Sequence, residues 1–317
     1  MVKILFFGTA AISKAFLENL YENKREILCV TMPDKPASRG QKLTPPAVKT
    51  FAVEKGLPYI QPEKFTQDII ERIKSFDADV GIAVAYGKII PQDVFNLAKH
   101  KTFNIHFSLL PKYRGAAPVQ HALLNGETQT GVSSFYLEKT LDTGNILLQT
   151  KIPIDEKDNA QTLFEKLIPL GIKVMNDTLE LLKNANTEGS AQEGPASYAP
   201  SLKKEDGLIN WRKSSEEILN ALRGFYPWPG IYCVVSKGKL QGKRIKILDF
   251  EIVETASENA DAGKVLSVEK NKGFSVVCGK GKILVVKVQP ENKHEMPSWD
   301  FLQSGQLKEG DELNGKV

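Results

Sequence analysis

The chain has 317 residues, of which 41% are hydrophobic and 25% are charged. These proportions are ordinary for a soluble globular protein, and the length is sufficient for two domains. No apolar stretch approaches the roughly 20 residues that a membrane-spanning helix requires, so we expect no membrane partner.

The N-terminus and the cysteines indicate the cellular compartment. The chain begins with a short apolar run, Val2–Phe7, that ends in a turn at Gly8, which is typical of a first strand rather than of a signal peptide. Cys29, Cys233 and Cys278 are isolated and show neither disulfide nor metal-ligand spacing. We therefore expect a cytoplasmic protein in which the three cysteines are packing residues.

The first half of the chain alternates short apolar runs with amphipathic stretches. Strands are expected over Lys3–Phe7, Ile27–Thr31, Val80–Ala85 and Phe103–Phe107. Helices are expected over Ile12–Tyr21, Ala47–Lys55, Ile69–Phe76 and Ala116–Leu124. This alternation predicts a Rossmann-like, mostly parallel sheet with helices on both faces.

The second half predicts paired strands, a long helix and a second domain. Val132–Leu137 and Ile146–Ile154 are expected to pair around a turn at Asp142, before a helix over Asn159–Leu182. A polar stretch rich in small residues, 184–200, indicates a linker. Five short strands follow, over Tyr232–Val235, Ile245–Phe250, Val265–Val268, Phe274–Val277 and Ile283–Val288. We therefore expect an α/β domain (1–183), a linker (184–203) and a smaller C-terminal β-barrel domain of the oligonucleotide-binding type (204–317).

The positive charge of the chain is concentrated near its end. The net charge is +4, and residues 201–317 hold 19 Lys and Arg against 16 Asp and Glu, an excess of +3. Five basic residues and no acidic ones lie in Lys237–Lys246. Both a polyanionic partner and a solvated basic hairpin are compatible with this pattern.

Two loops near the N-terminus bear on ligand binding. Gly8 follows the first strand where a dinucleotide-binding protein has three glycines, but only this one is present, which disfavours an NAD enzyme. The long segment Pro33–Pro45 carries Lys35, Arg39 and Lys42. It is either a phosphate-contacting flap or an exposed loop.

The clearest chemical signal is the pair Asn104 and His106. If both lie on one strand, their side chains point to the same side. An amide can donate to a developing oxyanion and an imidazole can move a proton, while a carboxylate such as Asp142 can fix the imidazole tautomer. This set suits acyl transfer, although spacing alone does not bring Asp142 to His106, and a structural histidine is the alternative. No metal site is indicated.

At these residues the chain resembles a known family. Asn104–Gln120 together with Leu141–Gly144 is similar to the 10-formyltetrahydrofolate-dependent formyltransferases, for which this pair of motifs is highly specific. Further similar segments run through most of the chain: Phe7–Thr9, Pro33–Leu43, Ala85–Pro91, Tyr198–Leu202, Ile209–Trp211 and Pro227–Pro229. The basic insertion loop and the C-terminal β-domain narrow the resemblance to the branch that acts on methionyl-tRNA.

The resemblance implies a reaction and a set of residues. The formyl group of 10-formyltetrahydrofolate, a co-substrate, would pass to the α-amino group of methionyl initiator tRNA, in a monomeric enzyme without a metal. The implied catalytic residues are Asn104, His106 and Asp142. The implied folate-binding residues are Ser108, Leu109, Leu110 and Pro111. The expected tRNA-binding residues are Arg39, Lys42, Lys243, Arg244 and Lys246.

Two other functions remain as alternatives. A folate-dependent formyltransferase that acts on an amino sugar nucleotide would share the Asn104, His106 and Asp142 set, but it would not need the basic loop or the basic C-terminal domain. A non-catalytic RNA-binding protein that has kept the fold would not need the three polar residues.

Overall fold

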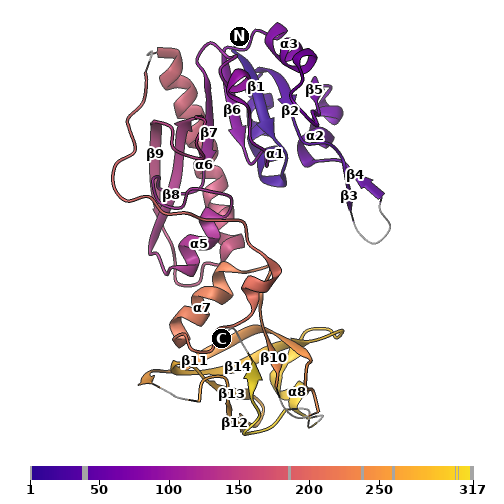
Figure 1. Cartoon of the computed structure of the whole chain (residues 1–317), viewed down its shortest axis with the longest axis vertical. Helices are drawn as coiled ribbons and strands as arrows, with labels where there is room; N and C mark the ends of the chain where they lie inside the picture. Colours follow the sequence, from indigo (N-terminus) through magenta and orange to yellow (C-terminus); the bar gives the residue numbers. More distant parts are fainter. Residues whose placement is uncertain are drawn as a thin grey trace. The chain divides into compact units, whose positions relative to one another are not determined.

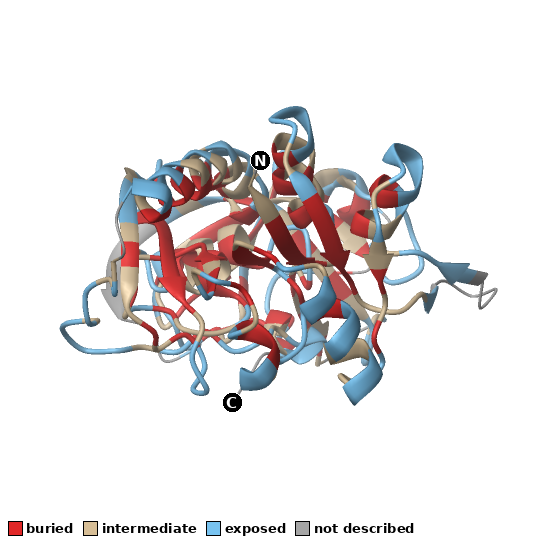
Figure 2. Ribbon diagram, turned by 90° about the horizontal axis from the view of Figure 1, so that it is seen from above, coloured by how far each residue is buried: buried red, intermediate tan, exposed pale blue. Residues whose placement is uncertain are grey.

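The computed structural model describes residues 2–37, 42–184, 187–236, 239–258, 261–303, 305 and 307–314. These residues form two compact units (Figure 1). Unit 1 consists of Met1–Pro118, Gln129–Pro153 and Phe164–Ala199, and unit 2 consists of Val119–Thr128, Ile154–Leu163 and Pro200–Val317. Buried residues concentrate on the strands and on the inner sides of the helices (Figure 2). In the part of the chain described, no helix is both long enough and apolar enough to cross a bilayer.

Unit 1 is built on a mixed seven-stranded sheet with the order β5-β2-β1-β6-β7-β8-β9. Its strands are β1 (Lys3–Gly8), β2 (Glu26–Val30), β5 (Tyr59–Ile60), β6 (Val80–Val84), β7 (Thr102–His106), β8 (Gln129–Tyr136) and β9 (Ile146–Pro153). The first five strands in that order pair in parallel, whereas β8 and β9 pair antiparallel. The predicted Rossmann-like, mostly parallel sheet is therefore confirmed.

Helices cover both faces of this sheet, which agrees with the continuous burial of successive side chains along β1, β2 and β6. The helices are α1 (Ala11–Glu22), α2 (Ala47–Lys55), α3 (Gln67–Ser75), α4 (Gln92–Phe95), α5 (Pro118–Leu124) and α6 (Ala160–Asn184). Leu5 and Phe7 of β1 share one hydrophobic cluster with Ile73 of α3 and Phe95 of α4. On the other face α1 and α6 lie together, because Asn176 Nδ2 donates to Asn19 Oδ1 at 2.9 Å.

Phe107 packs on the α1 and α6 face. Its ring meets Phe16 edge-on at 6.2 Å and Phe164 at 5.8 Å between ring centres. Gly171 of α6 makes room for this cluster, since a Cβ there would lie 2.8 Å from Phe16 Cζ and 3.4 Å from Phe107 Cε1. Strand alternation thus directs Phe107 away from the side that carries Asn104 and His106.

Two segments are more ordered than their sequence predicts. Within 33–45, β3 (Lys35–Ala37) pairs antiparallel with β4 (Lys42–Thr44), forming a ribbon that projects from the body of unit 1 (Figures 1 and 2). In the expected linker, Ser190 exchanges two backbone hydrogen bonds of 2.8 Å with Ile146. Residues 187–199 are therefore bound to unit 1 rather than forming a free tether.

Unit 2 contains the predicted β-barrel. Its sheet has the order β12-β13-β14-β11-β10-β16, with β15 paired to β14, and all pairs are antiparallel. The strands are β10 (Ile231–Val235), β11 (Arg244–Glu258), β12 (Val265–Glu269), β13 (Gly273–Val277), β14 (Lys280–Pro290), β15 (Met296–Pro297) and β16 (Leu313–Asn314). Register shifts along β11 bend the sheet. A bridge between Lys264 and Glu312 joins its two ends, so the sheet curls back on itself.

Short helices and two earlier chain segments complete unit 2. The helices are η1 (Lys204–Gly207), α7 (Ser215–Gly224) and α8 (Ser298–Leu302). The Arg223 guanidinium of α7 donates to the backbone oxygens of Asp155 (2.8 Å) and Asp158 (2.6 Å). Leu124 packs against the hydrophobic core of the barrel, next to Gly224. Residues 119–128 and 154–163 therefore belong structurally to the C-terminal body, although the linker follows them in the chain.

The three cysteines are all buried, and none of them forms a disulfide. Burial raises the pKa of each thiol, that of Cys29, Cys233 and Cys278, to about 12. A thiol with such a pKa is almost entirely protonated near neutral pH, and the protonated form is a poor nucleophile. The expectation that these residues only fill space agrees with this environment.

We predict that none of the three thiols of the native protein reacts within minutes with an aromatic disulfide reagent at pH 8, because burial blocks access and suppresses the thiolate. The release of the coloured thiol product measures the reaction. After unfolding in urea, all three should react. A thiol that reacts in the native state at the rate of a free small-molecule thiol would contradict the burial described above.

Candidate active site

Asn104 and His106 lie on β7, at the carboxyl end of the parallel part of the sheet. Asn104 pairs with Ala83 of β6 and with Phe135 of β8, and His106 pairs with Ser133. The two side chains point to the same side, as predicted from their spacing. The His106 side chain is buried, whereas Asn104 is partly exposed and makes no side-chain hydrogen bond to another described residue.

The His106 ring is oriented by the backbone. Its Nε2 lies 2.8 Å from the Tyr113 carbonyl oxygen, which can only accept a hydrogen bond, so Nε2 carries a proton. In the neutral ring, Nδ1 is then unprotonated and available as an acceptor. Phe135 packs edge-on against the imidazole at 6.2 Å, which restricts its rotation.

Asp142 lies beside His106, which the family resemblance implied and the spacing in the sequence could not predict. Its Oδ2 lies 3.9 Å from His106 Nδ1 and accepts a 2.7 Å hydrogen bond from the Gly115 N–H. A separation of 3.9 Å is too long for a hydrogen bond. The Tyr113 carbonyl therefore sets the tautomer, and the expectation that the Asp142 carboxylate does so is wrong. The carboxylate is still close enough to stabilise a positive charge on the ring.

The loop that carries these two backbone groups has an unusual conformation. Tyr113 has φ 62°, in the left-handed region that residues with a side chain adopt uncommonly, and Gly115 has φ 121°, which strongly favours glycine. A Cβ at Gly115 would lie 2.6 Å from the Ala199 carbonyl oxygen. The Arg114 N–H donates to the Ser197 carbonyl oxygen at 2.8 Å, and the Arg114 carbonyl oxygen accepts from the Ala199 N–H at 2.7 Å. These two hydrogen bonds hold the loop in place.

Sequence reasoning did not identify Tyr113 and Gly115 as site residues. Each contributes a backbone group, and side-chain patterns do not indicate where a carbonyl or an N–H will point. The available signal was Gly115 itself, which lies in a segment of small residues between a strand and a helix.

The predicted folate-binding segment, 108–111, begins two residues after His106. Ser108 and Leu110 are buried, and the Ser133 hydroxyl braces the segment by donating to the Ser108 carbonyl oxygen at 2.7 Å. Leu109 and Pro111 are partly exposed. A ligand here would therefore meet Leu109, Pro111 and the backbone rather than the other two side chains.

The basic residues expected to bind tRNA lie in two places. Arg39 is outside the described residues, and Lys42 is the first residue of β4 in the projecting ribbon. The exposed residues of β3 and β4 include Lys35 and Leu43. The ribbon therefore presents basic sequence on an exposed element of unit 1.

The second basic group lies at the start of β11 in unit 2. Lys243 is exposed, with its Nζ 3.9 Å from a carboxylate oxygen of Glu291. The Arg244 guanidinium lies over the Tyr232 ring, 5.2 Å from its centre. Lys246 is partly exposed and opposite Tyr232 in the β10–β11 register. Cationic and aromatic side chains thus lie together on this part of the barrel.

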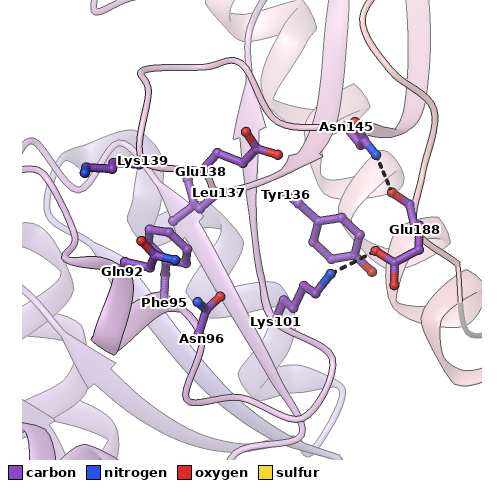
Figure 3. A pocket seen from close by; sticks show the side chains of 10 residues that line it. All are labelled: Gln92, Phe95, Asn96, Lys101, Tyr136, Leu137, Glu138, Lys139, Asn145 and Glu188. Carbon is purple, nitrogen blue, oxygen red and sulfur yellow. Dashed lines mark hydrogen bonds and ion pairs between the residues drawn. The ribbon is translucent and has the colours of Figure 1, made fainter.

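A cavity of about 390 Å³ lies elsewhere in unit 1, near the residues that precede β7 (Figure 3). It is lined by Gln92, Phe95, Asn96, Lys101, Tyr136, Leu137, Glu138, Lys139, Asn145 and Glu188. The Lys101 ammonium pairs with Glu188 at 2.9 Å, and the Tyr136 hydroxyl donates to the Thr187 carbonyl oxygen. None of Asn104, His106 and Asp142 lines this cavity, so we do not assign the chemistry to it. No group of three or more metal-ligating side chains occurs among the described residues.

Comparisons with known proteins agree with this geometry. A family profile described as formyl transferase matches residues 2–179, and one described as formyl transferase, C-terminal domain, matches residues 201–306. The methionyl-tRNA formyltransferase of Endomicrobium trichonymphae is 59% identical over 310 residues, which cover 98% of this chain and 99% of that protein. The protein of the same name from Thermodesulfovibrio yellowstonii is 41% identical over 309 residues, 97% of each chain.

A solved structure extends the comparison to the fold. The N-formyltransferase from Helicobacter canadensis, in complex with folinic acid and dTDP-3-aminofucose, matches with a TM-score of 0.66 at 22% identity. The match covers 92% of this chain and 100% of that chain. At this level of identity the likeness concerns the fold.

The close approach at Gly115 predicts that a side chain at this position destabilises the protein. Gly115→Ala should lower the free energy of unfolding by on the order of 3 kcal/mol, because the new Cβ meets the Ala199 carbonyl and the φ angle is unfavourable. Gly56→Ala is the matched control, since Gly56 has φ 66° but nothing within 4 Å of its Cβ position. It should cost about 1–2 kcal/mol. Urea unfolding followed by circular dichroism measures both, and equal losses would contradict the close approach at Gly115.

Proposed function

The chain belongs to the formyl transferase family, and we propose that it transfers the formyl group of 10-formyltetrahydrofolate to the α-amino group of methionine on initiator tRNA. The proposal rests on the identity of 59% to a methionyl-tRNA formyltransferase, which spans both units of this chain. The geometry around His106 supports it, because a donor, a proton carrier and a carboxylate converge on one end of the sheet.

In the proposed reaction, the methionine amine attacks the formyl carbon, and the carbonyl oxygen becomes an oxyanion. Asn104 is suited to stabilise it, because its amide is partly exposed and not engaged by other described residues. A hydrogen bond that forms fully only as negative charge develops lowers the barrier rather than merely binding the substrate.

Proton transfer is assigned to His106. As the new C–N bond forms, the amine must lose a proton, and the folate nitrogen that carried the formyl group must gain one before that bond breaks. The unprotonated Nδ1 of His106 can accept the first proton and deliver it to the leaving nitrogen. Asp142, 3.9 Å away, stabilises the imidazolium formed in between.

The folate is assigned to the segment 108–111. This segment begins two residues after His106, so a formyl group held there would lie near Asn104. The partly exposed Leu109 and Pro111 offer apolar contacts to a planar ring system. The Helicobacter canadensis enzyme was solved with folinic acid, a formylated folate, on the same fold.

The tRNA is assigned to the two basic elements. Arg39, which lies outside the described residues, and Lys42 of β4, with Lys243, Arg244 and Lys246 of unit 2, provide positive charge for phosphates. Stacking of Arg244 on Tyr232 holds that guanidinium in a fixed orientation. In this proposal the enzyme acts as a monomer in the cytoplasm.

The alternative acceptor is an amino sugar nucleotide, since the Helicobacter canadensis protein, which shares the fold, was solved with dTDP-3-aminofucose. One assay separates the two functions. The protein is mixed with labelled 10-formyltetrahydrofolate and either methionyl initiator tRNA or a dTDP-amino sugar, and the formylated product is identified by mass. Transfer to the sugar alone would reject the proposal.

We expect Asn104→Ala to lower kcat by about 10²–10³, because one oxyanion donor is lost. The Kd for tRNA should remain nearly unchanged. Asn104→Asp should show a similar loss, since it keeps the shape but removes the donor. Asn176→Ala, which removes only a hydrogen bond to Asn19, is the control. Steady-state kinetics measure kcat, and near-normal turnover of Asn104→Ala would rule out the assigned role.

Arg39→Ala and Lys42→Ala should each weaken tRNA binding and leave folate binding unchanged. If each residue contacts a phosphate, the slope of log Kd against log salt should decrease by about one per residue. Lys99→Ala, which removes a lysine paired with Asp77 and Asp79, is the charge-matched control. Filter binding over a salt series measures the effect, and loss of folate binding in either variant would contradict the assignment.

A further inference from the structure

Gln192 connects the two loops of the candidate active site. It lies in the segment 187–199, which follows α6 and is bound to unit 1, and its side chain is partly buried. We propose that Gln192 is a positioning residue that holds Asp142 at its working distance from His106. The inference rests on the proposed function, since it concerns the same reaction.

The Gln192 amide is fully engaged. Its Nε2 donates to the carbonyl oxygens of Asp142 and Gly144, both at 2.9 Å. Its Oε1 accepts from Arg114 Nε at 3.2 Å and from Arg114 Nη2 at 2.7 Å. Two donor hydrogens and two acceptor directions are the whole capacity of a primary amide, and all are used within unit 1.

Through these contacts Gln192 connects the Arg114 loop with the Asp142 turn. Arg114 is the residue between Tyr113, whose carbonyl binds His106, and Gly115, whose N–H binds Asp142. Gln192 therefore joins the loop that anchors both side chains to the turn that carries the carboxylate. The distance between His106 and Asp142 depends on how these two loops are held together.

The turn at Asp142 needs such a restraint. Asp142 has φ 54°, a left-handed conformation that is unfavourable for a residue with a side chain. The turn is also tight, because a Cβ at Gly144 would lie 1.8 Å from the Tyr136 carbonyl oxygen. Without Gln192, the Asp142 and Gly144 carbonyls would lose their side-chain donor, and the turn would relax toward a less strained geometry.

Only glutamine supplies both halves of this connection. Glutamate would still pair with Arg114, but it would place negative charge against the Asp142 and Gly144 carbonyls. Methionine would keep the length and lose every hydrogen bond. The two variants therefore separate the contact to the Asp142 turn from the contact to Arg114.

Asn145 offers a matched control. Its Nδ2 donates to the Glu188 carbonyl oxygen at 2.9 Å, so it also joins the turn region to the segment 187–199 (Figure 3). Its side chain makes no hydrogen bond to Asp142 or Arg114 among the described residues, and its hydrogen bond to Glu188 is exposed to solvent. Asn145→Ala thus removes a bond between the same two segments and leaves the carboxylate turn alone.

The test measures kcat and KM for formyl transfer by Gln192→Glu, Gln192→Met and Asn145→Ala, each alone and combined with Asp142→Asn. Both Gln192 variants should lower kcat by about 10- to 100-fold, with KM for tRNA and folate within about twofold. Asn145→Ala should have no effect. Combined with Asp142→Asn, the Gln192 variants should cause no further loss, since the residue acts through Asp142. Additive losses, or a change confined to KM, would overturn the proposal.

A second measurement does not depend on activity. The chain has four histidines, so the His106 ring proton signals can be assigned with a His106→Gln variant. Gln192→Met should shift the His106 signals in the same direction as Asp142→Asn, and Asn145→Ala should not. Unshifted His106 signals in a folded Gln192→Met protein would overturn the proposal. If the wild-type protein formylates no methionyl-tRNA, the proposed function fails, and this measurement still decides whether Gln192 holds Asp142.

Discussion

Two backbone groups in one short loop determine the distance between His106 and Asp142. The Tyr113 carbonyl binds the imidazole, and the Gly115 N–H binds the carboxylate. The two side chains come from separate parts of the chain, yet both are fixed to the same three residues. The backbone of this loop is held by hydrogen bonds and moves less than free side chains would. It therefore fixes the distance between the His106 ring and the Asp142 carboxylate.

The topology of unit 1 explains why this loop lies where it does. Strand β7 is the last parallel strand, and the chain leaves it at the end of the sheet where α/β proteins bind ligands. Strand β8 then runs antiparallel beside β7 and ends opposite Phe103, at the start of that strand. The Asp142 turn that follows β8 is held beside His106 by the hydrogen bonds from Gly115 and Gln192, so loop contacts rather than strand pairing place this acid and base next to each other.

The sheet and the shared side of Asn104 and His106 could be predicted from the sequence, but the loop contacts that hold the site together could not. The apolar periodicity of β1, β2, β6 and β7 is strong, so the parallel sheet could be predicted, as could the shared side of Asn104 and His106. The barrel could be predicted from short strands separated by turn residues. Strands β15 and β16 could not, because two residues are too few to show the alternation of apolar and polar side chains that marks a strand. The segment 187–199 read as a linker because its backbone hydrogen bonds and Gln192 contacts depend on tertiary structure.

Unit 2 is assembled from three stretches of sequence that are interrupted by parts of unit 1. During synthesis, residues 119–128 and 154–163 leave the ribosome long before their partners in unit 2 are made. These partners are the hydrophobic core that covers Leu124 and the Arg223 guanidinium of α7, which donates to the carbonyl oxygens of Asp155 and Asp158. A protein shortened at Ala199 would keep these early stretches with their apolar and polar surfaces uncovered. Residues 200–317 therefore cannot be removed without exposing surface that is buried in the whole chain. We expect the remaining fragment to aggregate rather than to behave as a smaller, folded enzyme.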